Sequence, residues 1–224
     1  MRPVDYRKFR LKYRNTPEFS HVKLLLFWPI FGLFFAFVER VGVSNVYTPI
    51  HIPLDDHIPF CEWFVIPYLF WFVFLIGMLV YTFFFEVPAF RKMMRFVICT
   101  YSVTMAIYIL FPNCQNLRPT AFPRDNILTR FMAWFYTFDT NTNVCPSLHV
   151  IGAVASLYAG WKSRRFGTRP WRIVFSVITV LISLSTVFLK QHSALDVFAA
   201  LPLCALGWWV AELRIPKKKF AQAR

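Results

Sequence analysis

The sequence predicts an all-α membrane protein: a single polytopic helix bundle with six transmembrane helices and both termini in the cytoplasm. Hydrophobic residues make up 57% of the 224 residues and charged residues 16%, against about 45–50% and about 25% in soluble domains. Six apolar runs approach the length of about 20 residues that a helix needs to cross a bilayer. The cations gather in alternate loops, as the positive-inside rule requires.

The predicted spans are the six apolar runs, taken in chain order: 22–38, 63–85, 96–111, 145–161, 173–189 and 194–213. Several are short, and flanking Trp, Tyr, Lys and Arg side chains can extend them to the interface. The first run follows a long basic arm and precedes no small-residue cleavage site, so we expect a retained span. The stretch FMAWFY at 131–136 is too short to span and is expected at the outer interface.

The positions of Lys and Arg predict the orientation of the bundle. All but five of the 25 cations lie in or beside the arm 1–21, the loops after the second and fourth spans, and the tail 214–224. These segments are therefore expected in the cytoplasm. The net charge of +14 raises nucleic acid as a partner. However, the cations form short blocks between apolar runs rather than a stripe with stacking aromatics, so we expect no nucleic-acid partner.

Three clusters of polar residues fall at span ends on the outer side. They are CQNLRP at 114–119, CPSLHV at 145–150 and STVFLKQHSALD at 185–196. Span ends on the same side of a compact bundle can converge. We therefore expect one pocket at membrane depth that contains Arg118, His149, Lys190, His192 and Asp196.

The last cluster contains a histidine and a carboxylate with helical spacing. His192 and Asp196 are four residues apart, which places them on one face of a helix. A carboxylate near membrane depth is costly and is a functional candidate by default. Asp196 is expected to orient the His192 imidazole or to stabilise its cationic form.

The second cluster has the composition of an anion site. Pro146 fits the first position of a helix, which would leave the amides of Ser147 and Leu148 free to bind a phosphate at the helix N-terminus. His149 follows at the edge of that site. Arg118 can add a bidentate donor and Lys190 a point charge. Together with His192 and Asp196, this set predicts phosphoryl transfer.

These residues resemble the three motifs of the type 2 phosphatidic acid phosphatase superfamily, K-x6-R-P, P-S-G-H and S-R-x5-H-x3-D. The matching stretches are RP at 118–119, PSLH at 146–149 and the segment 185–196. The resemblance implies that His192 is a nucleophile that forms a phosphohistidine, that Asp196 holds and activates it, and that His149 is the general acid. It also implies that Arg118, Ser147 and the backbone of Leu148 hold the phosphate, with no metal or other cofactor.

The chain departs from the motifs at three positions. Phe111 replaces the lysine of the first motif, Leu148 the glycine of the second and Thr186 the arginine of the third. Lys190 is the candidate replacement for one of the missing cations. This altered pattern is similar to the branch that contains inositol phosphorylceramide synthases and other sphingolipid head-group transferases.

The resemblance implies a lipid phosphatase that hydrolyses a phosphate monoester or diphosphate at the extracytoplasmic face. The alternative within enzymes is a phosphotransferase, in which a lipid alcohol replaces water. A membrane transporter would instead carry charges near mid-span and often show paired halves. The expected partners are the lipid substrate and membrane lipids, with no obligate protein partner. The compact loops favour a bacterial plasma membrane.

Two features of the outer side complete the predictions. Cys114 and Cys145 flank the first two motifs, and we hypothesise a disulfide that ties Arg118 to the anion site. The loop with Asp55, Asp56 and His57 is interpreted as a solvated outer loop. It is not interpreted as a metal site, because no further ligands recur at metal spacing.

Overall fold

The computed structural model describes residues 4–42 and 44–213. The predicted basic tail 214–224 lies outside these residues. The described chain is mostly helical, with eight α-helices: α1 (Phe27–Arg40), α2 (Pro53–His57), α3 (Val65–Phe85), α4 (Val87–Leu110), α5 (Ile127–Phe138), α6 (Leu148–Lys162), α7 (Arg169–Phe188) and α8 (Ala194–Glu212). Short 3-10 turns occupy Tyr6–Lys8, Leu11–Tyr13, Ser20–Leu26 and Glu62–Phe64.

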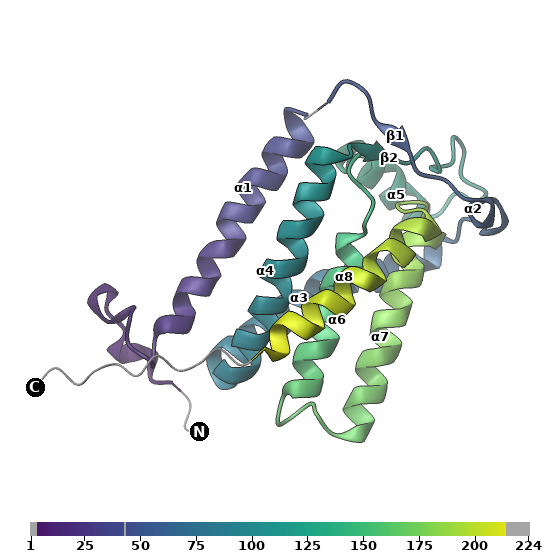
Figure 1. Ribbon diagram of the computed structural model, residues 1–224. Coiled ribbons are helices and arrows are strands. Elements are labelled where there is room, and N and C mark those ends of the chain that lie inside the picture. Colours follow the sequence, from purple (N-terminus) through teal and green to yellow (C-terminus); the bar gives the residue numbers. More distant parts are fainter. Residues whose placement is uncertain (1–3, 43, 214–224) are drawn as a thin grey trace, which may run out of the picture.

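Two short strands join loops that are far apart in the sequence. β1 (Thr48–Pro49) pairs in parallel with β2 (Asn113–Cys114), with Thr48 opposite Asn113 and Pro49 opposite Cys114. Cys114 also forms an antiparallel bridge with Thr142. The strands, α2 and α5 lie at one end of the bundle (Figure 1), which we call the capped end.

Five helical stretches of the described chain are long and apolar enough to cross a membrane. They are Ser20–Arg40, Glu62–Phe85, Val87–Leu110, Arg169–Phe188 and Ala194–Glu212. Each overlaps one of the predicted spans, and together they are consistent with an integral membrane protein. Apolar side chains such as Ile30, Leu33 and Ile66 are more than half exposed, as expected of surfaces that face lipid rather than water.

The fourth predicted span, 145–161, is helical as expected but is shorter than the five stretches above. It forms α6, a helix of 15 residues, which is about 22 Å long at 1.5 Å per residue. α6 lies in the centre of the bundle and packs against α3, α4, α7 and α8. Small residues such as Gly152, Ala155 and Ala159 are completely buried there, so neighbouring helices approach closely. Because other helices surround it, α6 does not need the length of a lipid-exposed span.

The six long helices run alternately between the two ends of the bundle (Figure 1). At the end opposite the capped end, Glu86 between α3 and α4 accepts hydrogen bonds from the Ser163 hydroxyl and the Arg164 amide, both at 2.8 Å. At the same end, Lys92 of α4 and Glu212 of α8 form an ion pair at 2.6 Å. The cation-rich loops and the end of α8 therefore lie together, away from the polar motifs.

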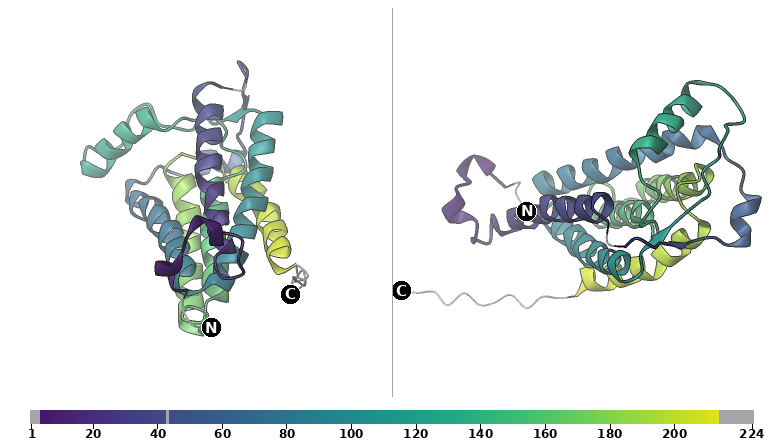
Figure 2. Two further views of the ribbon diagram at one scale, coloured as in Figure 1. Left: turned by 90° about the vertical axis from the view of Figure 1, so that its left-hand side faces the viewer. Right: turned by 90° about the horizontal axis from the view of Figure 1, so that it is seen from above.

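α5 contains the stretch 131–136 that was expected at the outer interface. The helix has 12 residues, and its N-cap Asn126 accepts hydrogen bonds from the amides of Leu128 and Thr129. It projects across the capped end at a steep angle to the bundle helices (Figure 2). Within α5, the Met132 side chain is buried, whereas the Trp134 side chain is 59% exposed. One face of α5 therefore packs on the bundle, and the opposite face is exposed.

Candidate functional site

The predicted histidine–carboxylate pair lies where α8 begins. His192 is in the turn before the helix and Asp196 is in its first turn, so the two do not share one helical face as predicted. His192 Nδ1 lies 3.0 Å from Asp196 Oδ2, and the same oxygen accepts the Ser193 amide at 3.0 Å. Asp196 is fully buried and His192 is 6% exposed. An ionised Asp196 can only accept, and this arrangement assigns the donor role to Nδ1 and leaves Nε2 of a neutral imidazole with its lone pair directed away from Asp196.

The second histidine lies directly against this lone pair. His149 Nδ1, from the first turn of α6, is 3.4 Å from His192 Nε2 although the residues are 43 positions apart. The rings of Tyr68 and Trp71 from α3 lie 4.7 and 4.6 Å from the His149 ring. These aromatic contacts limit the positions open to the imidazole. The structure therefore brings His149, His192 and Asp196 into one cluster.

The start of α6 differs in detail from the predicted anion site. Pro146 precedes the helix rather than opening it, and Ser147 is the N-cap, whose hydroxyl accepts the Val150 amide at 3.4 Å. The Ser147 amide donates to the Asp196 carbonyl at 3.1 Å and is not available to a ligand. The first helical amides are those of Leu148 and His149, and a helix N-terminus leaves such groups without intrahelical partners.

A small cavity of about 70 Å³ opens beside the histidines. Its wall combines α1, α4, the segment after α5 and the two histidine segments, as follows: Phe35, Glu39, Tyr108, Asp139, Thr140, Thr142, Asn143, Val144, Leu148, His149, Gln191 and His192. Among the described residues, no Lys or Arg lines it. Glu39, Asp139 and Asn143 were missed at the sequence level, because nothing in their local sequence links them to the histidines.

Arg118 does not point into this cavity, contrary to the predicted phosphate contact. Its Nε and Nη2 donate to Gln191 Oε1 at 3.1 and 2.7 Å, its Nη1 to the carbonyls of Tyr136 and Asp139, and its Nη2 also to the Thr140 carbonyl. A guanidinium has five N–H donors, and all five are used. Arg118 therefore holds the segment after α5 against the turn before His192.

Arg118 also lies close to one carboxylate of the cavity, that of Asp139. Its Nη2 lies 3.7 Å from Asp139 Oδ2, and the same oxygen accepts Gln191 Nε2 at 2.9 Å. Burial raises the pKa of Asp139, and the positive charge of Arg118 opposes that rise. Asp139 thus has a cation beside it, whereas the other carboxylate of the cavity, Glu39, bonds to the neutral side chains of Thr140 and Asn143.

Lys190 is also turned away from the cavity, so the predicted point charge on a phosphate is not observed. Its Nζ donates to the Asp55 carbonyl at 2.8 Å, and its backbone has a φ of 53°. Burial lowers the pKa of Lys190, while Asp55 and Asp56 raise it. The side chain therefore anchors the α7–α8 turn to α2.

Asp55 is a site residue that the sequence reasoning placed wrongly in a solvated loop. It is 1% exposed, and its carboxylate accepts the Ser193 hydroxyl at 2.6 Å and the Ala194 amide at 2.7 Å. It thus caps α8 in the residues that follow His192. Its neighbour Asp56 is 64% exposed and bonds His51 at 2.8 Å, as a solvated loop would. The described residues contain no group of three or more His, Cys, Asp and Glu that could hold a metal.

The predicted disulfide between Cys114 and Cys145 is not observed. All five cysteines lie in the described part of the chain and carry free thiols. Asn113 makes the connection instead: its Oδ1 accepts the amides of Val144 and Cys145 at 2.9 and 2.8 Å, and its Nδ2 donates to the Cys145 carbonyl at 3.0 Å. A buried amide side chain therefore ties the first polar cluster to the second without a covalent bond.

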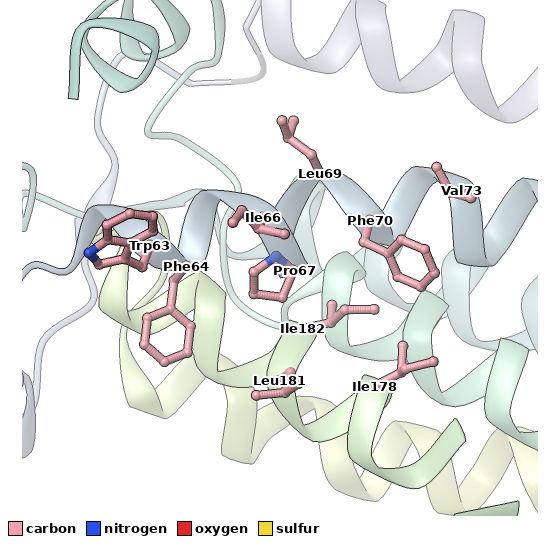
Figure 3. Close-up of a pocket in the computed structure, with 10 residues that line it drawn as sticks. All are labelled: Trp63, Phe64, Ile66, Pro67, Leu69, Phe70, Val73, Ile178, Leu181 and Ile182. Atoms are coloured by element: carbon pink, nitrogen blue, oxygen red, sulfur yellow. The ribbon is translucent and has the colours of Figure 1, made fainter. Parts of the chain in front are cut away.

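A larger groove of about 620 Å³ lies between α3 and α7 (Figure 3). Residues such as Ile66, Phe70, Ile178 and Leu181 line it, and all of its lining side chains are apolar apart from the Trp63 indole N–H. It contains no group that could attack phosphorus or act as a general acid. Of the two, only the small polar cavity is lined by titratable side chains.

The fold and the site together define a class: a mostly helical chain with helices of membrane-spanning length and a buried His–His–Asp cluster near one end of the bundle. Comparisons of the chain with protein-family models, with curated proteins and with solved structures found no match. The proposed function consequently depends on the geometry of the residues themselves and on the motif resemblance.

Proposed function

We propose that the chain is an integral membrane enzyme that cleaves a lipid phosphate ester through a phosphohistidine at His192. The observation that carries the proposal is the alignment of three side chains. Buried Asp196 holds one nitrogen of His192, and the other nitrogen lies 3.4 Å from His149. A nucleophile oriented by a third group and placed next to an acid–base group is the general pattern of covalent catalysis.

In the first step, the lone pair of His192 Nε2 attacks phosphorus, and the bond between phosphorus and the alcohol oxygen breaks. Protonated His149 donates its proton to that oxygen, so the alcohol leaves neutral. Asp196 stabilises the positive charge that develops on His192. In the second step, an acceptor hydroxyl attacks the phosphohistidine, His149 takes the hydroxyl proton, and His192 leaves with its electron pair.

The phosphate group is held without a lysine or arginine in this proposal. The amides of Leu148 and His149 at the start of α6 are the donors, and the helix N-terminus supplies partial positive charge. Arg118 and Lys190 act indirectly, because their bonds to Gln191 and to the Asp55 carbonyl fix both sides of the turn that carries His192.

The acceptor hydroxyl distinguishes a phosphatase from a transferase. Water as the acceptor makes the chain a lipid phosphatase, and a lipid alcohol makes it a head-group phosphotransferase. The cavity favours the transferase as the second candidate. A phosphate monoester carries close to two negative charges at neutral pH, whereas a diester carries one, and Glu39 and Asp139 already place carboxylates in the cavity.

The polar site lies at the end of the bundle opposite the cation-rich loops. If those loops face the cytoplasm, as the positive-inside rule requires, the site opens at the extracytoplasmic face, which we propose to be that of a bacterial plasma membrane. A site at the depth of the headgroups would meet its lipid substrate without lifting the acyl chains out of the bilayer.

The test is substitution of the proposed nucleophile in the purified full-length protein. His192→Ala is expected to lower turnover of lipid phosphates and phospholipids by a factor on the order of 10³ or more. The control is His51→Ala, because His51 lies on the exposed surface of the outer loop. Labelled head groups should be followed with and without ceramide or diacylglycerol: free phosphate indicates a phosphatase, and a new phospholipid indicates a transferase.

Trapping the labelled enzyme provides a second measurement. Acid-labile, alkali-stable label on His192 is expected with wild type and absent in His192→Ala. The mechanism would be contradicted if the His192→Ala protein elutes from size-exclusion chromatography as a folded, monodisperse species and still shows near-normal turnover.

A further inference from the structure

Hydrogen-bond acceptors gather in the cavity beside the histidine pair. Glu39 from the last turn of α1, Asp139 after α5 and Asn143 before α6 all line it together with His149 and His192. α1 thus contributes to the site through its final turn, although most of its surface is exposed. The charges and hydrogen-bond acceptors of these side chains that have no partner in the protein indicate which ligand groups the cavity can bind.

Glu39 carries a carboxylate that no cation of the described chain neutralises. Its Oε1 accepts Asn143 Nδ2 at 3.0 Å and its Oε2 accepts the Thr140 hydroxyl, and both donors are neutral. None of the ion pairs among the described residues includes Glu39. The adjacent Arg40 instead donates to the Phe138 carbonyl at 3.4 Å and lies over the Phe138 ring.

Asn143 supplies an independent indication of a missing donor. It is 4% exposed, and the bond from its Nδ2 to Glu39 fixes which side of the amide is the oxygen. That oxygen, Oδ1, is buried and has no hydrogen-bond partner among the described residues. A buried acceptor without a donor costs stability, so this atom is suited to a ligand that brings an N–H or O–H group.

We infer that this cavity binds a primary ammonium group, carried by the head group of a phospholipid substrate. The positive charge matches Glu39, and an N–H of the ammonium satisfies Asn143 Oδ1. A quaternary ammonium has no N–H for Asn143, and a neutral polyol leaves the charge of Glu39 unbalanced. The aromatic rings of Phe35 and Tyr108 in the same lining suit a cation as well.

The inference also divides the cavity between the two charges of a zwitterionic head group. The amides at the start of α6 and the histidines take the phosphate, while Glu39 and Asn143 take the ammonium. The role of this group as part of a substrate rests on the proposed function. The binding preference itself does not, because it depends only on the acceptors of the cavity.

The binding test uses the full-length protein in detergent and soluble head groups as probes. O-phosphoethanolamine and phosphocholine differ in the N–H donors of the ammonium, and inositol 1-phosphate lacks the ammonium. Titration calorimetry is expected to give O-phosphoethanolamine an affinity about tenfold or more above either of the others, the factor that a charged hydrogen bond contributes. Equal affinities for the three probes would overturn the inference.

The variant test removes the charge of Glu39 and keeps its shape. Glu39→Gln is expected to weaken O-phosphoethanolamine binding about tenfold or more, while Asp125→Asn, an exposed carboxylate of the outer loops, leaves it unchanged. Unchanged affinity in a folded Glu39→Gln protein contradicts the inference. If Glu39→Gln does not fold, the comparison of the three probes on the wild-type protein decides the matter.

The two proposals fail separately. If the protein turns over lipids through His192 but shows no preference for O-phosphoethanolamine, the ammonium site is contradicted and the proposed enzyme is supported. If the protein prefers O-phosphoethanolamine but turns over no phospholipid, and His192→Ala binds the probe as wild type does, the ammonium site is supported and the proposed reaction is contradicted.

Discussion

Asp55 determines the position of His192 without touching it. Its carboxylate binds Ser193 and Ala194, the two residues after His192, and its carbonyl accepts Lys190, two residues before. Residues on both sides of the histidine are therefore attached to α2, in the loop between α1 and α3. If His192 is the nucleophile proposed above, this support matters because such a group must be held within fractions of an ångström of its productive position.

Substitution of Asp55 is therefore expected to affect the rate more than substrate binding. Asp55→Ala should lower kcat about 10- to 100-fold, the range for lost supporting hydrogen bonds, with little change in KM. Asp55→Asn keeps an acceptor for the Ala194 amide and should recover part of the loss. Asp56→Asn, on the exposed neighbour, is the control. A rise in KM with unchanged kcat would show that Asp55 acts on the substrate rather than on His192.

At the scale of elements, α6 carries His149 and is enclosed by α3, α4, α7 and α8. Its small residues admit α3 and α4 at close range, and α3 in turn places Tyr68 and Trp71 on His149. A Cβ at Gly152 would lie 2.8 Å from the Tyr101 hydroxyl and 2.9 Å from Trp71 Nε1. The packing of α6 and the position of His149 are thus coupled through Trp71.

Gly152→Ala should therefore lower both stability and activity. Overpacking of this kind costs about 1–3 kcal/mol, and displacement of Trp71 should disturb His149. Gly77→Ala in α3 is the matched control, because a Cβ there meets nothing within 4 Å and Ala favours a helix over Gly by about 1 kcal/mol. Thermal unfolding and turnover of both variants provide the measurement, and equal behaviour of the two would contradict the role of close packing.

At the scale of the whole molecule, the two ends of the bundle carry different kinds of polar residue. The capped end gathers the site, two strands and α5, while the opposite end gathers the basic loops around Glu86, Lys92 and Glu212. Burial raises the pKa of Glu86, but hydrogen bonds from the Arg164 amide, Ser163 and Tyr81 outweigh burial, so its pKa lies below the ordinary 4.5. Glu86 thus links the start of α4 to the loop between α6 and α7.

This lowered pKa predicts an acid-sensitive contribution to stability. Ionised Glu86 stabilises the fold above the unfolded-state pKa of 4.5, and the contribution is lost as the pH falls through the lower folded-state pKa. Glu86→Gln should therefore be less stable than wild type near neutral pH, and the difference should shrink in acid. Thermal unfolding across this range measures it, with Glu18→Gln in the arm as the control. A difference that is independent of pH would contradict the assignment.

The sequence by itself determined the helical membrane segments and the pairing of His192 with Asp196. Hydropathy is read over one helix, and a separation of four residues keeps the two side chains near each other. The predicted shared helical face is wrong, because His192 precedes the N-cap Ser193 and only Asp196 lies in α8. The histidine in CPSLHV was also placed correctly beside that pair, since helices of alternating direction bring alternate helix ends together at one end of the bundle.

Only the tertiary structure decided which groups surround the histidines and which way the cations point. Asp55 and Glu39 reach the site across separations of 138 and 104 residues, and no local pattern encodes such contacts. Arg118 and Lys190 have the charge for phosphate, but buried carbonyl and amide oxygens within reach of their N–H groups compete for them. The enclosure of α6 by four helices is also decided by the tertiary structure, because hydropathy alone does not distinguish burial among helices from burial in lipid.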